Sequence, residues 1–243
     1  MAKKLFLIPT SISNDNSLTT LPTFTSRNIE QLRIFFVEGE KVARIFLKKI
    51  QPQISFQDYT FYPLSEHTSL KEIEQYVRVI LENDAGIISE TGCPCVADPG
   101  ADLVLLAHQN NIEVIPLVGP SSIILALMAS GLNGQNFAFH GYLPREKEQR
   151  IKKIKELERL SERENQTQIF MEAPYRNEQI LEDIMSSCFL KTLLCVACDL
   201  TAKNQFIKTS SIEEWKKQKP ALHRKPTLFL INKFKDVHYR PSH

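Results

Sequence analysis

The chain has 243 residues, of which 42% are hydrophobic, so it can bury the core of one large domain or the cores of two small ones. Its 30 lysines and arginines against 28 aspartates and glutamates leave a net charge of +2, which excludes a strong overall field for a polyanionic partner. A nucleic acid would have to bind at a local basic patch.

The cysteines and the apolar runs favour a cytoplasmic protein. Five cysteines are an odd number, and no signal sequence precedes the first apolar run, so we expect free thiols in a reducing compartment. The longest apolar stretch, residues 114–132, is interrupted by Pro116, Gly119 and Pro120. This pattern predicts a strand, a turn and a buried helix, and no membrane span.

Short apolar runs with the length of buried strands come first in the chain, and helix-like patterns such as residues 71–81 separate them. This alternation predicts an α/β fold whose first sheet is parallel and covered by helices. The expected strands of this part are residues 5–8, 34–37, 86–89 and 113–118.

After Gly119 the strand-like runs come with fewer helices between them, which indicates a second α/β domain with a mixed sheet. We therefore expect domains at residues 1–116 and 117–243. The expected strands of the second domain are residues 137–142, 168–172, 193–198, 205–209 and 226–232.

The densely charged stretch 145–164 carries Ile151, Ile154, Leu157 and Leu160 at three-residue spacing. This spacing predicts an amphipathic helix with one solvated face.

Four turn-rich segments each come directly after an expected strand. In an open α/β sheet, ligands bind beyond the carboxyl ends of the strands, so these segments are the candidate binding loops. They are residues 9–15, residues 90–100 (ETGCPCVADPG), residues 119–122 (GPSS) and residues 171–176 (MEAPYR).

The second segment is the most distinctive of the four. Gly92 and Gly100 permit positive backbone angles and close approach of a ligand to the main chain. Asp98 before Pro-Gly is equally consistent with a turn and with a ligand-binding role. In the third segment, serines and free amides open an apolar helix and can donate to a carboxylate or a ribose.

The sequence lacks the motifs of several other common kinds of functional site. The chain has no six-position glycine-rich dinucleotide motif and no phosphate-binding loop, which disfavours the usual nicotinamide enzymes and kinases. We expect no metal site, because Cys93 and Cys95 are separated by one residue while Cys195 and Cys198 lie in an apolar strand-like run.

The order of these segments resembles the tetrapyrrole methylase superfamily and, within it, the bacterial 16S rRNA cytidine 2′-O-ribose methyltransferases. The resemblance runs from Leu5 to about Thr201. It is carried by ETGCPCVADPG, VIPLVGPSSIILALMASGL, FHGYLPR, MEAPYR and CDLT, which stand in the family's order.

The resemblance implies two α/β domains, S-adenosylmethionine bound in a cleft between them, and a homodimer. It also implies which residues bind the cofactor. By position these are Pro9, Thr91, Gly92, Cys93, Pro94, Val96, Ser121 and Ser122 in the first three loops, with Met171, Leu200 and Thr227 lining the adenosyl group.

The sequence departs from the family pattern at several positions. Ser13 stands where the rRNA family carries Gly, and Glu90 stands where Asp is usual. Cys93 and Cys95 replace the common Thr and Leu. VEGEK at residues 37–41 occupies the place of a Glu-Asp-Thr-Arg signature. This last change bears on the substrate, because the signature would lie towards the substrate side.

A ribose hydroxyl is a poor nucleophile, so a proton acceptor beside it is useful. The catalytic candidates are Glu66 and His67, which match a Glu-His pair of the rRNA family, and Glu172 and Arg176 of MEAPYR, with Glu38 as a further acid. A loop-to-helix cap accounts equally well for Glu66 and His67, and a surface ion pair or helix cap is the alternative for Arg176.

The leading function is 2′-O-ribose methylation of 16S rRNA, with the small ribosomal subunit as partner. Basic residues that could meet phosphates support it, namely Arg145, Lys147, Arg150, Lys152 and Lys153. The alternatives are a methyltransferase that acts on a small molecule, such as a tetrapyrrole precursor, and a degenerate binding protein without catalysis.

Overall fold

The computed structural model of the chain describes residues 3–13 and 21–234, which form two compact units, Met1–Ser121 and Ser122–His243. The expected boundary after residue 116 lies a few residues earlier in the same connecting segment. Among the described helices, none combines the length and the apolar character that crossing a bilayer requires.

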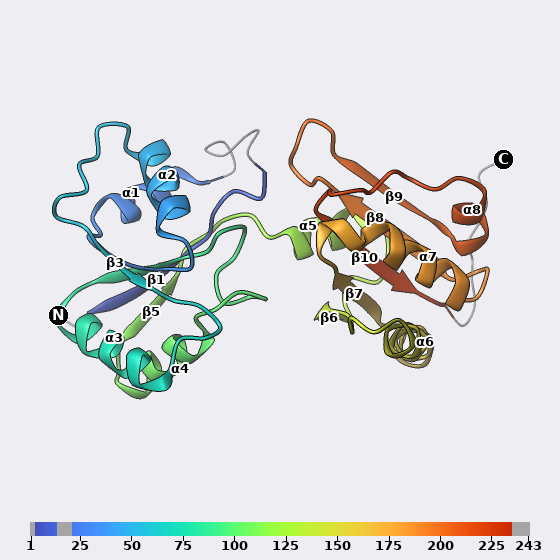
Figure 1. Ribbon diagram of the computed structural model, residues 1–243, viewed down its shortest axis with the longest axis horizontal. Helices are drawn as coiled ribbons and strands as arrows, with labels where there is room; N and C mark the ends of the chain where they lie inside the picture. The colour runs from blue at the N-terminus through green and yellow to red at the C-terminus, as the bar shows by residue number, and fades with distance from the viewer. Residues whose placement is uncertain (1–2, 14–20, 235–243) are drawn as a thin grey trace. The chain divides into compact units, whose positions relative to one another are not determined.

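The first unit has a five-stranded sheet in the order β3-β2-β4-β1-β5, and every pairing in it is parallel, as the sequence predicted (Figure 1). In chain order its elements are β1 (Lys4–Ile8), α1 (Thr23–Glu30), β2 (Ile34–Val37), α2 (Glu40–Ile50), β3 (Thr60–Pro63), α3 (Leu70–Glu82), β4 (Ala85–Ile88), α4 (Ala101–Gln109) and β5 (Glu113–Pro116).

Helices cover both faces of this sheet, because successive strand residues point to opposite sides. Leu5 and Phe36 are fully buried against α3 and α4, whereas Phe35 and Ile8 are fully buried against α1 and α2. Helix α3 begins at a capping box, in which the Ser69 side chain accepts from the Glu72 amide and Glu72 accepts from the Ser69 amide.

The second unit has a mixed sheet, as the sequence predicted, and its strand order is β6-β7-β10-β8-β9. Strands β6 and β7 are parallel, and β10 runs antiparallel to both β7 and β8. In chain order its elements are α5 (Ser122–Ser130), β6 (Phe137–Tyr142), α6 (Lys147–Glu164), β7 (Thr167–Met171), the 3-10 turn η1 (Pro174–Arg176), α7 (Asn177–Ser187), β8 (Leu193–Cys198), β9 (Phe206–Ser211), α8 (Ile212–Lys217) and β10 (Thr227–Asn232).

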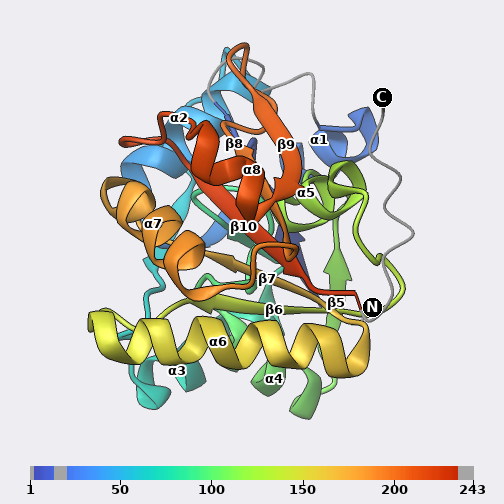
Figure 2. The same ribbon diagram turned by 90° about the vertical axis from the view of Figure 1, so that its right-hand side faces the viewer.

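The helices of the second unit also lie on both faces of its sheet. Helices α6, α7 and α8 share one core with Leu194 and Val196 of β8 (Figure 2). Cys195 faces the other side and pairs in register with Thr209, whose hydroxyl donates to the Ser130 carbonyl of α5 at 2.7 Å. Helix α5 therefore covers the opposite face.

Helix α6 packs differently from the expected stripe of apolar residues. Ile154 and Leu157 are buried as predicted, but Arg150 and Glu158 are buried with them, at 1% and 2% exposure. Arg150 Nε and Nη2 both lie 2.7 Å from Asp183 Oδ2, and Nη1 donates to the Arg145 carbonyl. A charge can be buried in this way because acceptors surround it.

The expectation that Arg150 meets phosphates is therefore wrong. Its guanidinium joins α6 to α7 inside the unit and has no exposed face for RNA. Of the same basic stretch, Lys153 forms an ion pair with Glu156 at 2.8 Å, while Arg145, Lys147 and Lys152 are exposed.

Candidate functional site

The loops that follow β1, β4 and β5 meet at the carboxyl end of the first sheet, where these three strands are neighbours. The Gly92 carbonyl joins two of them, because it accepts from the Thr10 amide at 2.9 Å and from the Ser89 hydroxyl at 2.6 Å. The Cys93 thiol donates to the Pro120 carbonyl at 3.5 Å and so joins the second loop to the third. Three of the four segments selected from the sequence thus form one cluster. Asn14 and Asp15 of the first segment lie outside the described residues.

Two glycines make this convergence possible. A Cβ on Gly119 would lie 2.2 Å from Pro9 Cγ, so only glycine lets the third loop approach the first so closely. Gly92 has a φ of 75°, and a Cβ built there would meet no atom closer than the Pro120 carbonyl oxygen at 3.8 Å. The space beside Gly92 is therefore open to a ligand.

Backbone strain is concentrated in the candidate loops. Seven non-glycine residues of the described chain have a positive φ, and four of them lie in the loops after β4 and β8. These are Cys95, Ala97, Asp199 and Thr201. Such backbone angles cost about 1–3 kcal/mol each and gather at ligand sites, so the observation supports a binding role for both loops. These four positive angles could not be predicted from the sequence, because none of the four residues is glycine.

The candidate cofactor residues of the second unit also lie at one edge. Met171 ends β7, Leu200 follows the end of β8, and Thr227 begins β10. Because β10 runs antiparallel to both neighbours, its first residues pair with the last residues of β7 and β8, as Thr227 does with Cys198. Leu200 and Thr227 are buried, and Thr227 Oγ1 donates to the Lys225 carbonyl at 2.9 Å.

Of the remaining candidates, Thr91 and Val96 are exposed, while Pro94 is buried within the loop after β4. The boundary between the two units falls between the two serines of the third segment. Ser121 ends the first unit and hydrogen-bonds with Cys93, and Ser122 begins α5 of the second.

Carboxylates gather beyond the ends of β2, β3 and β4. Burial, Glu90 and Glu66 together raise the pKa of Glu38. Burial, Glu38 and Glu90 raise the pKa of Asp98 to about 6, and Asp98 Oδ2 is buried without a hydrogen-bond partner among the described residues. These carboxylates lie close enough to repel one another. A cluster of this kind can contain a group that takes up a proton near neutral pH.

Glu66 belongs to this acidic group, but His67 is 87% exposed and lies 3.6 Å from Glu66. Neither residue caps α3, since Ser69 does so. The sequence reading did not identify Glu90 as a member of the group. Glu90 could have been found from the sequence, because it lies two residues after the end of β4, much as Glu38 lies directly after the end of β2.

The segment after β7 forms a second polar group, within the second unit. Glu172 Oε1 accepts hydrogen bonds from the Ala173 amide and from Arg176 Nη2. The Glu172 side chain is fully buried, and Arg176 is 17% exposed. Asn177 donates to the Lys225 carbonyl at 2.6 Å.

Buried polar atoms without a partner are concentrated in this segment. Six such side-chain atoms occur in the described chain, and three of them are Glu172 Oε2, Arg176 Nε and Asn177 Oδ1. Buried polar groups are nearly always satisfied, so this concentration indicates a place prepared for a polar ligand. Arg176 does form the ion pair that was the alternative prediction. The pair is not at the surface, however, because the Glu172 carboxylate is buried.

The cysteines have the character of buried thiols. Cys93 and Cys95 are half-buried, and burial raises the pKa of Cys93 and raises that of Cys95 to about 11, so both thiols are protonated at neutral pH. All five cysteines are free, and no group of three metal-binding side chains occurs among the described residues.

Comparison with known proteins identifies the family. The family model for Tetrapyrrole (Corrin/Porphyrin) Methylases matches residues 25–216, which include most of both units. The chain belongs to the tetrapyrrole methylase family. The resemblance seen in the sequence is confirmed, and with it methyl transfer as the class of reaction.

Curated members of the family share modest identity with this chain over most of its length. The Ribosomal RNA small subunit methyltransferase I of Vibrio cholerae is 28% identical over 211 residues, which cover 86% of this chain and 69% of that protein. The protein of the same name from Streptococcus pyogenes is 29% identical with the same coverage. The one from Halalkalibacterium halodurans is 30% identical over 184 residues, or 74% of this chain and 59% of that protein.

Solved structures of tetrapyrrole methylases have the same fold. The methyltransferase CobJ matches with a TM-score of 0.61 and 15% identity, over 95% of this chain and 93% of that one. A uroporphyrin-III-C-methyltransferase from Thermus thermophilus matches with a TM-score of 0.55 and 14% identity, over 95% and 94% of the two chains. The expected α/β fold is thereby confirmed.

Proposed function

We propose that this protein is an S-adenosylmethionine-dependent methyltransferase that methylates a ribose 2′-hydroxyl of small-subunit ribosomal RNA. The proposal that the protein binds this methyl donor rests on the convergence of the loops after β1, β4 and β5 around Gly92. The choice of acceptor is supported by relatives named Ribosomal RNA small subunit methyltransferase I, which are similar to 86% of the chain.

The residues present suit this cofactor. In the first unit the open space beside Gly92 and the adjoining amides and hydroxyls suit a ligand with an amino acid group and a ribose. In the second unit Met171, Leu200 and Thr227 lie at the same edge of the sheet, and we propose that they line the adenosyl group. When bound, the cofactor supplies a methyl group that is already activated for displacement.

The protein's own part is to orient the acceptor and to take its proton. Arg176 and the Ala173 amide both bind Glu172 Oε1, which fixes the carboxylate and leaves Oε2 as an acceptor without a partner among the described residues. We propose Glu172 as the group that receives the proton of the ribose hydroxyl and Arg176 as the residue that positions it. Glu66 and the acids around Glu38 are the alternative acceptors.

We further propose that the protein is cytoplasmic, where ribosomal RNA is found, and that it acts as a homodimer. Helix α5 exposes Ile124 and Met128, at 44% and 74%, and apolar side chains exposed along one helix favour a protein partner. Light scattering of the purified protein would give its mass in solution, and a monomer at micromolar concentration would contradict the dimer.

The experiment that tests the function is methyl transfer from isotope-labelled S-adenosylmethionine to purified 30S subunits, with 50S subunits and a tetrapyrrole precursor as alternative acceptors. Digestion of the labelled RNA to nucleosides and mass spectrometry would identify the product. We expect label in a 2′-O-methylated nucleoside from 30S subunits alone. Label in the tetrapyrrole, or none in 30S subunits while the cofactor binds, would contradict the proposed acceptor.

A further inference from the structure

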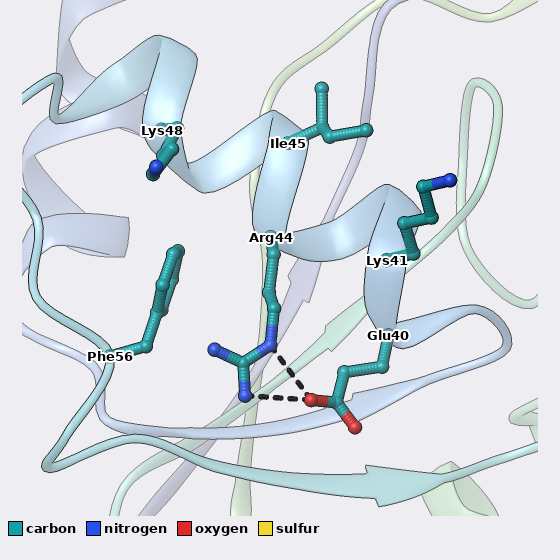
Figure 3. A pocket seen from close by; sticks show the side chains of 6 residues that line it. All are labelled: Glu40, Lys41, Arg44, Ile45, Lys48 and Phe56. Carbon is teal, nitrogen blue, oxygen red and sulfur yellow. Dashed lines mark hydrogen bonds and ion pairs between the residues drawn. The ribbon is translucent and has the colours of Figure 1, made fainter.

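Helix α2 and the loop that follows it form an open surface pocket of about 570 Å³ on the first unit (Figure 3). Lys41, Arg44 and Lys48 of α2 line it together with Phe56 of the loop. The volume lies within the range of sites that hold small organic ligands, and a nucleobase is smaller than that.

Arg44 and Phe56 form the centre of this surface. Arg44 Cζ lies 4.7 Å from the centroid of the Phe56 ring and 4.6 Å from that of Phe61, and Arg44 Nε and Nη2 each lie 2.7 Å from Glu40 Oε1. Figure 3 shows Arg44 between Phe56 and Glu40. Glu40 and the rings therefore hold the guanidinium plane in one orientation, with Phe56 beside it as a half-buried aromatic surface.

The aromatic surface continues beyond the pocket. The Phe56 and Tyr59 rings meet edge to face at a centroid distance of 5.5 Å, and Arg33 Cζ lies 4.8 Å from the Tyr59 centroid. Two cation–aromatic pairs thus lie next to each other. Phe35 and Phe61 stack on the Tyr59 ring, at centroid distances of 6.1 and 6.5 Å, so Phe56 at the pocket is the ring that can offer a face to a base, as aromatic side chains do when proteins bind a single strand.

The charge of this surface is positive. Residues 40–59 contain four cationic and two acidic side chains, and Glu40 neutralises Arg44. Lys41 and Lys48 are exposed and have no ion-pair partner among the residues that the structure describes.

We infer that the surface formed by Lys41, Arg44, Lys48 and Phe56 binds a single-stranded segment of RNA, with a base against the Phe56 ring and phosphates at the two lysines. The inference rests on the proposed function for the class of partner. It goes beyond it because it names a surface on α2, apart from the loops that converge around Gly92. The two lysines, unpaired among the described residues, and the half-buried ring beside them favour RNA over a protein partner, for which an apolar surface alone would serve.

The test is the binding of a fluorescently labelled single-stranded RNA of mixed sequence to the full chain at several salt concentrations. For Lys41→Ala/Lys48→Ala we expect binding weaker by roughly five- to tenfold at low salt, and a salt slope reduced by about 1.4, since each phosphate contact on a single strand contributes about 0.7. The matched control is Lys216→Ala/Lys217→Ala, which removes two exposed lysines from α8. We expect the control to bind like the parent protein.

A second pair of variants tests the Phe56 ring. Phe56→Leu removes the aromatic face, and we expect it to weaken binding roughly fivefold or more at all salt concentrations, with an unchanged slope. Phe56→Tyr keeps a ring and should retain binding. Melting temperatures close to that of the parent would show that neither change acts through unfolding.

The outcomes separate this inference from the proposed function. If the parent methylates 30S subunits but the lysine pair and Phe56→Leu bind RNA normally, the α2 surface is not the RNA site and the function stands. If RNA binding depends on α2 but 30S subunits are not methylated, the surface stands and the acceptor is wrong. A parent protein that binds no RNA at all overturns the inference.

Discussion

Glu172 and Arg176 form an ion pair in which one carboxylate oxygen accepts from the guanidinium and the other, Oε2, is buried without a partner among the described residues. This pairing fixes the orientation of an acceptor at the end of β7. Under the proposed mechanism it also separates two roles that the sequence could not separate, because Arg176 would act through Glu172.

We predict that Glu172→Gln lowers methyl transfer to 30S subunits about a hundredfold or more, because a positioned proton acceptor contributes about 10²–10⁴ in rate. Cofactor affinity, measured by calorimetry, should be unchanged. The control is Glu178→Gln in the first turn of α7, an exposed acid whose loss should leave the rate unaltered. A fully active Glu172→Gln variant would show that the Glu172–Arg176 pair has only a structural role.

Arg176→Ala should retain cofactor affinity and lose transfer by roughly tenfold or more, the scale of one charge-assisted contact worth ~1.5 kcal/mol. It also leaves Glu172 buried without its cation, so the melting temperature must be measured beside the rate. Arg176→Lys keeps the charge and should recover part of the rate. Transfer at the parental rate by the alanine variant would contradict the positioning role.

S-adenosylmethionine and its demethylated product should raise the melting temperature of the free protein. A ligand at 100 times its Kd that binds only the folded state stabilises it by about 2.7 kcal/mol. Methionine and adenosine, each alone, serve as controls for the two halves of the cofactor. An unchanged melting temperature at millimolar cofactor, together with no heat in calorimetry, would contradict the cofactor assignment.

Gly92→Val should abolish cofactor binding while the protein stays folded. The valine Cβ enters the open space beside the loop and must adopt a φ of 75°, which costs about 1–2 kcal/mol. Gly131→Val is the matched control, because Gly131 has a φ of 69° and also lies in open space, but follows α5. We expect similar loss of stability in both variants and loss of binding in the first alone.

Asp98→Asn should stabilise the protein at neutral pH. The pKa of Asp98 is raised from 3.8 to about 6, so its neutral form is favoured in the folded state, and the stability this gives is lost as pH rises from about 4 through 6. The melting temperature of the variant should equal that of the parent near pH 4 and exceed it at pH 7. Asp58→Asn, at an exposed loop position, should show no such pH-dependent difference.

Arg150→Ala should lower the free energy of unfolding by about 3–5 kcal/mol, because it leaves Asp183 buried and unpaired. The exposed neighbour Lys152→Ala should change it by less than about 0.5 kcal/mol. Urea titrations measure both. RNA affinity per folded molecule should be the same for Arg150→Ala and the parent, and a specific loss of affinity would restore Arg150 to the RNA-binding surface.

The sequence by itself determined the strands of both units, apart from β3. Continuous apolar runs predicted buried parallel strands, and their bounds differ from the structure by at most a few residues. Strand β3 was missed because it is a short edge strand in which Thr60 and Pro63 are exposed, so its apolar signal is weak. The convergence of the candidate loops could be predicted because loops after parallel strands share one edge of a sheet.

Tertiary structure alone decided which charges are buried and which polar atoms meet. In the sequence Arg150 is one more cation on a helix with a solvated face. In the folded protein α7 places Asp183 against it. Glu38 is far in sequence from Glu90 and Asp98, which share the loop after β4, and only the order β2-β4 of the sheet brings Glu38 to them. Hydrophobic periodicity describes one segment at a time, whereas burial of a charge and a shift of its pKa depend on groups from other segments.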